Sequence, residues 1–418
     1  MLNGIFGKIN VNKRDFLVII LLFVSVFGWY YMARSILTNF LELTSATYEE
    51  NLAVWVVFNF SIIGSSIIGA TLSSRLNNNK FLYGWTLFGV IVSLLPMMYY
   101  SLTFIHIFVF ALLLGISFGL GMPYCLKHFA DSTTVENRGR IGGVSFLVAN
   151  ASVPLLGLVV QTGDWIIISL GFSLVRAIGL IFVFSRPQKN IVETKVTESF
   201  LSILSDKSFF LYFIVWFLFP LVDRFESSLI VSQVSSNLME DLLFTMNMVE
   251  PLVAAVTILV AGVLCDYIGR KKVLLFGFAS LGFAYAILGF FSESLSNLSL
   301  VWYFYFIIDA IAWGIFLLIF VLIIWGDLSK HGSRTKYYAI GSIPFFLSYI
   351  IPQMLTPSMI ENIVLDTAFS MAALFLFVAF LPLVFAPETL PEKKMELRRL
   401  KSFAEQAKKE REKFEQKN

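Results

Sequence analysis

The chain has 418 residues, of which 57% are apolar and only 14% are charged, and its formal net charge is +3. Soluble domains carry about 25% charged residues, and a soluble protein of this length needs more charge than this to cover its surface. The composition therefore excludes a soluble enzyme, a disordered chain and a disulfide-rich scaffold. It predicts an all-α integral membrane protein whose apolar side chains face lipid.

The first part of the chain, residues 1–184, is predicted to form a bundle of six transmembrane helices, because its apolar runs approach the roughly 20 residues that cross a bilayer. The predicted spans are Phe16–Phe40, Leu52–Leu72, Phe81–Ser101, Phe104–Leu126, Ile141–Val160 and Trp165–Phe184. Within the first span, Tyr30 and Arg34 are four residues apart and share a helix face. Arg34 is a functional candidate because a charge inside the membrane is costly. It would either attract an anionic substrate or balance an acidic side chain.

A polar linker, residues 185–208, separates this bundle from a second one, residues 209–386, which is followed by a charged tail, residues 387–418. The second bundle is also predicted to contain six spans. They are Phe209–Val231, Met246–Cys265, Val273–Phe291, Leu300–Leu322, Ala339–Leu355 and Thr367–Phe385. The tail is interpreted either as a helix near anionic lipid or as a solvated segment.

The seventh span carries three charged residues close together. Asp223 and Glu226 share one face, whereas Arg224 points about 100° away from them. Arg224 therefore needs a partner on another helix. Glu250, in the eighth span at a similar depth, is predicted to form a buried structural ion pair with it.

The tenth span carries an aromatic and acidic stripe, because Tyr305, Asp309 and Trp313 recur every four residues. A carboxyl group in an apolar cavity can bind and release a proton, which is the chemistry that proton coupling requires. The other two ionisable residues within spans, His106 and Arg176, are interpreted as an interfacial histidine and a structural arginine.

The loops differ strongly in charge on the two sides of the membrane. With twelve spans, every Lys and Arg outside the spans falls on one side, and the charged residues of the opposite loops are all acidic. Basic loops remain on the cytoplasmic side. We therefore expect a multi-pass protein of the plasma membrane with both termini in the cytoplasm.

The loop after the eighth span contains a spaced motif. Gly262 is followed by Asp266 four residues later, by Gly269 three residues after that, and then by Arg270 and two lysines. This loop resembles the signature loop of the major facilitator superfamily. The two halves also repeat, since three charged positions recur at a constant offset of 196 residues. The pairs are Asp131 with Asp327, Arg138 with Arg334, and Arg140 with Lys336.

The resemblance implies two six-helix pseudo-repeat bundles around a central cavity lined by spans 1, 4, 7 and 10. It also implies a cytoplasmic gate, in which Asp266 accepts hydrogen bonds from the N-terminus of span 5 and Arg270 pairs with Asp327. The repeat predicts a second pair, Arg75 with Asp131. The predicted gate comprises Gly262, Asp266, Gly269, Arg270, Asp327, Arg75, Asp131, Arg138, Arg140 and Arg334.

The predicted function is secondary active transport of a small solute by alternating access, with proton coupling as a hypothesis. The predicted substrate and proton pathway comprises Tyr30, Arg34, Asp223, Glu226, Tyr305, Asp309 and Trp313. The alternative is a non-transporting sensor or lipid-handling protein on the same fold. An enzyme is disfavoured, and with three His and two Cys we expect no cofactor and no metal site. The expected partners are the solute, protons and membrane lipid but no nucleic acid, and the expected state is a monomer.

Overall fold

The computed structural model describes residues 13–75, 78–98, 103–185, 198–233, 249–295, 299–330, 332–355, 359, 363–391 and 400. Ten helices in this part of the chain are long and apolar enough to cross a membrane. Two further segments, a shorter apolar helix and a broken one, occupy the positions of predicted spans 6 and 11. The described segments thus follow the predicted order of twelve spans.

The N-terminal half contains the first six segments. Their bounds are α2 (Lys13–Phe23), η1 (Val24–Gly28) and α3 (Trp29–Leu43) for span 1, α4 (Tyr48–Arg75) for span 2, α5 (Asn78–Leu94) with η2 (Leu95–Met98) for span 3, α6 (Phe104–Ser132), α7 (Arg138–Gln161) and α8 (Trp165–Ser185). Small residues let α4 and α6 pack closely, since the Ser65 hydroxyl donates to the Gly115 carbonyl across the two helices at 3.3 Å.

A short linker helix, α9 (Phe200–Leu204), leads into the C-terminal half. This half contains α10 (Lys207–Gln233), α12 (Glu250–Ile268), α13 (Arg270–Leu295), α14 (Ser299–Phe316) with η4 (Leu317–Ile323) and α15 (Ile324–Leu328), then α16 (Arg334–Gly341), α17 (Ile343–Ser348), α18 (Ile351–Met354) and α20 (Leu365–Phe385). The segments η1 and η4 are π-helical, so spans 1 and 10 each contain a π-helical stretch, a feature often found at functional sites.

The eleventh span differs from its prediction. The continuous helix expected over Ala339–Leu355 is wrong, because the segment is divided into α16, α17 and α18. Pro344 and Pro352 stand in the first turns of α17 and α18. Proline has no N–H and clashes with the preceding turn, so each break lies just before one of these residues.

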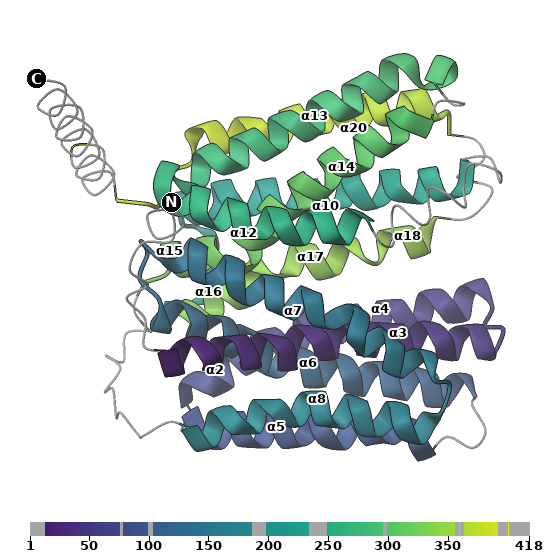
Figure 1. Ribbon diagram of the computed structural model, residues 1–418, viewed down its shortest axis with the longest axis vertical. Helices are drawn as coiled ribbons and strands as arrows, with labels where there is room; N and C mark the ends of the chain where they lie inside the picture. Colours follow the sequence, from purple (N-terminus) through teal and green to yellow (C-terminus); the bar gives the residue numbers. More distant parts are fainter. Residues whose placement is uncertain are drawn as a thin grey trace, which may run out of the picture.

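The two halves lie side by side as two helical layers (Figure 1). They meet where α7 packs against α12 and where α16 packs against α4 and α6. The α7–α12 crossing depends on glycine, since a Cβ atom added at Gly262 would clash with the Gly139 carbonyl, and one added at Gly139 would clash with that of Gly262. The first glycine of the signature loop therefore permits close contact between the two halves.

Candidate functional site

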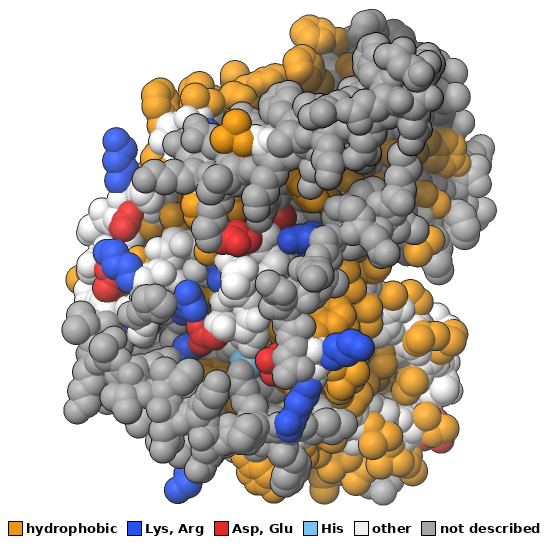
Figure 2. All heavy atoms as spheres, turned by 60° about the vertical axis from the view of Figure 1, so that its left-hand side comes forward, with side chains coloured by type: hydrophobic (Ala, Val, Ile, Leu, Met, Phe, Trp, Pro, Cys, Tyr) orange, Lys and Arg blue, Asp and Glu red, His pale blue; other side chains and the backbone are white. Residues whose placement is uncertain are grey.

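α2 begins and α20 ends at the same end of the molecule, which we call the basic end (Figure 1). Lys and Arg side chains lie there among Asp and Glu side chains (Figure 2). Several of them form ion pairs, which we call the basic-end network. Its members are Asp131, Arg138, Arg140, Asp266, Arg270, Asp327 and Arg334.

Asp266 joins the end of α12 to the beginning of α7. Its carboxylate accepts hydrogen bonds from the backbone N–H groups of Gly139 and Arg140, both at 2.9 Å. The Arg140 Nε atom lies 3.2 Å from the same carboxylate, and Arg270 Nη2 lies 3.4 Å from it. A carboxylate at a helix N-terminus satisfies free N–H groups and interacts favourably with the helix dipole. The bonds expected from the N-terminus of span 5 are therefore present.

Asp327 is the second centre of the network. Arg270 Nε lies 3.1 Å from its carboxylate, so the expected partners are in contact, and Arg138 from the N-terminal half contacts the other carboxylate oxygen. Arg138 also donates to the Ala130 carbonyl at 2.8 Å and to the Thr133 hydroxyl at 3.1 Å. The side chains of Arg138, Arg270 and Asp327 are at most 1% exposed. These contacts form a buried bridge between the halves.

Asp131 has a partner that was not predicted from the sequence. Its carboxylate contacts Arg334 of the opposite half, whose Nε atom lies 3.2 Å from the Ser329 hydroxyl. The Arg75 side chain lies outside the described residues, so the pair of Arg75 with Asp131 stays a prediction. Asp131 thus adds a third connection between the halves.

Glu388, which sequence reasoning did not assign to the gate, caps the beginning of α13. Its carboxylate accepts hydrogen bonds from the N–H groups of Arg270 at 3.0 Å and Lys271 at 3.1 Å. The preceding Gly269 has φ = 105°, and a Cβ atom there would clash with this carboxylate. The neighbouring Thr389 hydroxyl lies 3.1 Å from Asp327. The signal that could have found it is an acidic residue directly after the last span, on the side that carries the Lys and Arg residues of the loops.

Three carboxyl groups from α10 and α14 form an acid cluster inside the C-terminal half: Asp223, Glu226 and Asp309. They are 1%, 1% and 6% exposed. Asp223 accepts a hydrogen bond from the Trp313 indole at 3.0 Å, and the Tyr305 hydroxyl donates to Glu226 at 2.8 Å. The stripe on span 10 thus faces the acids of span 7.

The acid cluster has no cationic partner in the described part of the chain, where none of its members lies within 4 Å of a Lys or Arg nitrogen. Glu226 Oε1 and Asp309 Oδ1 also have no hydrogen-bond partner. The hydroxyl of Tyr285, which sequence reasoning missed, lies 3.5 Å from Asp223. Buried carboxylates without cations are very unfavourable. This arrangement therefore suits groups that bind protons.

The predicted ion pair of Arg224 with Glu250 is not formed within the described residues. Arg224 Nη2 instead donates to the Tyr349 hydroxyl at 3.2 Å, and its guanidinium lies over the rings of Tyr349 and Trp313. Glu250 is the first residue of α12, where the helix dipole stabilises an acidic side chain without a basic partner. The partner of Arg224 is therefore not on span 8 as predicted but on span 11, where the break in the helix places Tyr349 beside it.

Arg34 and Tyr30 lie on α3 at the contact between the halves. The Arg34 guanidinium lies 4.0 Å from the ring centroid of Tyr349, and Tyr30 packs against Phe118 with ring centroids 4.6 Å apart. Arg176, by contrast, is buried between the rings of Trp29 and Trp85 within the N-terminal half. This packing favours a structural role for Arg176.

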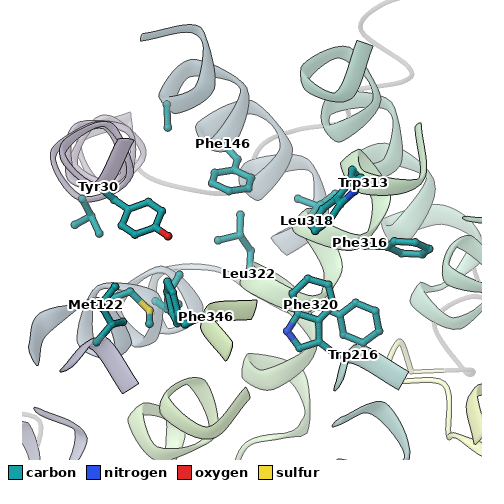
Figure 3. Close-up of a cluster of buried hydrophobic side chains, with 14 of the residues drawn as sticks. Tyr30, Met122, Phe146, Trp216, Trp313, Phe316, Leu318, Phe320, Leu322 and Phe346 are labelled. Carbon is teal, nitrogen blue, oxygen red and sulfur yellow. The ribbon is translucent and has the colours of Figure 1, made fainter. Parts of the chain in front are cut away.

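Aromatic and aliphatic side chains from both halves fill the centre of the molecule (Figure 3). They leave a cavity of about 40 Å³, whose lining includes Tyr30, Met122, Phe146, Trp216, Phe320 and Phe346. A water molecule needs about 10–15 Å³, whereas ligand pockets usually have several hundred. The centre is therefore closed around too little space for an organic solute.

The chain has recognisable similarity to known proteins. The family model of the Major Facilitator Superfamily matches residues 231–413. The fold is similar to that of a proton:xylose symporter of this superfamily, XylE, with a TM-score of 0.66 and 14% identity over 90% of this chain and 96% of that one. It is also similar to the human organic anion transporter MFSD10, with a TM-score of 0.65 and 15% identity over 89% of this chain and 99% of that one. None of the curated proteins matches the chain in sequence. These similarities confirm the predicted fold class.

Proposed function

The Major Facilitator Superfamily model matches residues 231–413, and the fold is similar to that of two transporters. On this basis we propose that the chain is a member of this superfamily and moves a small solute across the plasma membrane by alternating access, driven by protons. The chain is a multi-pass membrane protein, and the superfamily consists of transporters that bind small solutes and are not enzymes. The basic end faces the cytoplasm in this proposal, together with both termini, because basic loops remain on that side.

The basic-end network acts as the cytoplasmic gate. Its ion pairs join the two halves through Asp266 and Asp327, which contact residues at the beginning of α7. Opening the cavity towards the cytoplasm must separate these contacts and hydrate the charges. In the described arrangement the gate is closed, and so is the centre of the molecule.

Proton coupling is supported by one observation: the acid cluster contains three buried carboxyl groups, and no Lys or Arg nitrogen of the described residues lies within 4 Å of them. Binding a proton neutralises such a group when the cavity is dry, and hydration in an open state favours its release. A cycle in which Asp223, Glu226 or Asp309 exchanges a proton with one side of the membrane at a time couples proton movement to solute movement.

The test uses purified protein in proteoliposomes, with a solute selected by a thermal-shift screen and an imposed pH gradient. The variants are Asp223→Asn, Glu226→Gln and Asp309→Asn. We expect at least one of them to abolish uphill transport while solute exchange across the membrane continues, because exchange requires no net proton movement.

The matched control is Glu49→Gln, which removes an exposed acidic group near the beginning of α4 and is expected to leave uphill transport unchanged. Uphill transport at the wild-type rate in all three cluster variants contradicts proton coupling through this site. Absence of any solute flux contradicts the transport function itself.

A further inference from the structure

Two arginine side chains from opposite halves converge on one tyrosine. Arg34, on α3, has its guanidinium carbon 4.0 Å from the ring centroid of Tyr349, and Arg224, on α10, lies 4.4 Å from the same centroid. Arg224 also donates to the Tyr349 hydroxyl at 3.2 Å. Tyr349 follows α17 directly, in the broken eleventh span. Three segments of the chain therefore bring two positive charges to a single ring.

Neither arginine has an anionic partner in the part of the chain that the structure describes. No carboxylate oxygen there lies within 4 Å of either guanidinium, and the buried Arg224 Nε atom has no hydrogen-bond partner. A guanidinium offers five N–H donors and remains charged in proteins. Two such groups in an apolar surrounding repel each other unless an anion lies between them.

Aromatic rings surround this pair on both sides. The Trp55 ring lies 5.4 Å from Arg34, and the Trp313 ring lies 5.0 Å from Arg224. Phe345 packs edge-on against Tyr349 and also lines the central cavity. Trp55 in addition lines an open pocket of about 250 Å³. The arginine pair thus lies beside aromatic residues that line the central cavity and the open pocket.

We propose that Arg34, Arg224 and Tyr349 bind the anionic head of the transported solute, whose apolar or aromatic body occupies the central cavity when that cavity is open. The substrate class is then a small organic carboxylate. A carboxylate matches the planar donor pattern of guanidinium groups. Because the two arginines belong to different halves, the bound anion draws the halves together at this site. This inference names the substrate class of the transport function proposed above, and it depends on that function.

The alternative role for Arg34, that of balancing the acid cluster, is not favoured by the geometry. Trp313 contacts both sites, since its indole N–H donates to Asp223 at 3.0 Å and its ring centroid lies 5.0 Å from the Arg224 guanidinium. No carboxylate of a described acidic residue lies within 4 Å of the Arg34 guanidinium, which contacts the Tyr349 ring instead.

The experiment measures binding by purified protein in detergent, with thermal shift and calorimetry, and it requires no transport. The probes are benzoate, its neutral isostere benzamide and the cation benzylamine. We expect benzoate to raise the melting temperature and the other two to have no effect. In Arg34→Gln and Arg224→Gln, benzoate affinity should fall about tenfold or more, because each substitution removes a charged hydrogen-bonding partner.

The control Lys80→Gln removes one exposed positive charge near the beginning of α5 and should bind benzoate as the wild type does. Arg34→Lys and Arg224→Lys preserve the charge and should retain part of the affinity, which separates loss of binding from misfolding. Equal stabilisation by benzoate and benzamide overturns the proposal, as does wild-type affinity in both glutamine variants or no stabilisation by benzoate.

Failure of the anion site and failure of the transport function are distinguishable. Benzoate binding that depends on both arginines, without flux of benzoate in proteoliposomes, overturns the transport function and supports the anion site. Proton-driven flux of a neutral solute that is insensitive to both glutamine variants overturns the anion site and supports transport.

Discussion

Replacing Asp327 by asparagine removes the charge that holds Arg138 and Arg270 together across the two halves. The side chains of all three residues are at most 1% exposed. Removing one partner of a buried ion pair costs about 3–5 kcal/mol, because the other charge remains buried and unpaired. Both arginines keep other contacts, such as Arg138 with the Ala130 carbonyl and Arg270 with Asp266. We therefore expect Asp327→Asn to destabilise the closed state by about 3 kcal/mol, the lower end of that range.

A penalty of about 3 kcal/mol on the closed state shifts the closed–open equilibrium roughly a hundredfold towards opening at the basic end. Ser342→Cys provides a nearly isosteric reporter, because Ser342 lines the closed central cavity. With Cys125 and Cys265 replaced by serine, a membrane-impermeant maleimide added on the basic side should label this cysteine up to about a hundredfold faster in Asp327→Asn.

The matched control for this variant is Lys330→Gln. It breaks the ion pair of Lys330 with Glu198, in which the lysine side chain is 67% exposed, and exposed pairs contribute about 0–1 kcal/mol. Labelling in this control should stay within a fewfold of the rate for the parent protein, which carries Ser342→Cys and the two serine substitutions alone. An Asp327→Asn variant that is labelled at the same rate as this parent refutes the assignment of the network as a gate.

Three further predictions concern packing and capping, and each is checked by the melting temperature of the purified protein. Gly262→Ala should lower the melting temperature, because the added Cβ atom clashes with the Gly139 carbonyl and overpacking destabilises a protein by about 1–3 kcal/mol. Gly157 has open space around it, so Gly157→Ala should leave the melting temperature unchanged or raise it slightly. Arg176→Met should leave the melting temperature unchanged or raise it. Arg176 is a buried charged residue, two of whose nitrogens have no hydrogen-bond partner among the described residues, and methionine replaces it by an apolar side chain of similar size. A clear decrease means that the charge itself stabilises the fold. Glu388→Gln should also lower the melting temperature, because loss of a helix cap reduces stability by about 1 kcal/mol. An unchanged melting temperature contradicts the role of Glu388 at the beginning of α13.

The sequence predicted several contacts of the basic-end network because their signals are local. The spacing from Gly262 to Arg270 fixes which residues end α12 and begin α13, and the loop charges fix which end of the bundle they share. The pairing of Arg270 with Asp327 follows from these two facts and the family resemblance. The contact of Asp131 with Arg334 is related by the repeat to that of Asp327 with Arg138, since both residues differ by the same offset of 196. It was missed because the repeat was applied to the pair of Arg270 with Asp327 inside one half, and the sequence does not show which residues meet between the halves.

The intramembrane contacts were predicted less completely. Helical spacing correctly placed Tyr305 and Trp313 on one stripe, and this stripe meets the acids of α10. The partner of Arg224 was missed because it depends on how span 11 breaks. Pro344 and Pro352 are visible in the sequence, but the direction of the chain after each break is not, and that direction carries Tyr349 to the arginines.

Corresponding residues of the two halves make different contacts at the basic end. Asp266 caps the beginning of α7. Ser73 is its counterpart in the N-terminal half, because it lies four residues after Gly69 as Asp266 lies four residues after Gly262. Within the described residues, the Ser73 hydroxyl donates to the Ala70 carbonyl of its own helix, at 3.2 Å. The polar attachment at the basic end is therefore stronger at the α7–α12 contact than where α4 meets α16. We expect the α7–α12 contact to contribute more to the free energy of opening than the contact of α4 with α16. Substitutions at that crossing should consequently change the closed–open equilibrium more than substitutions of equal size along α4.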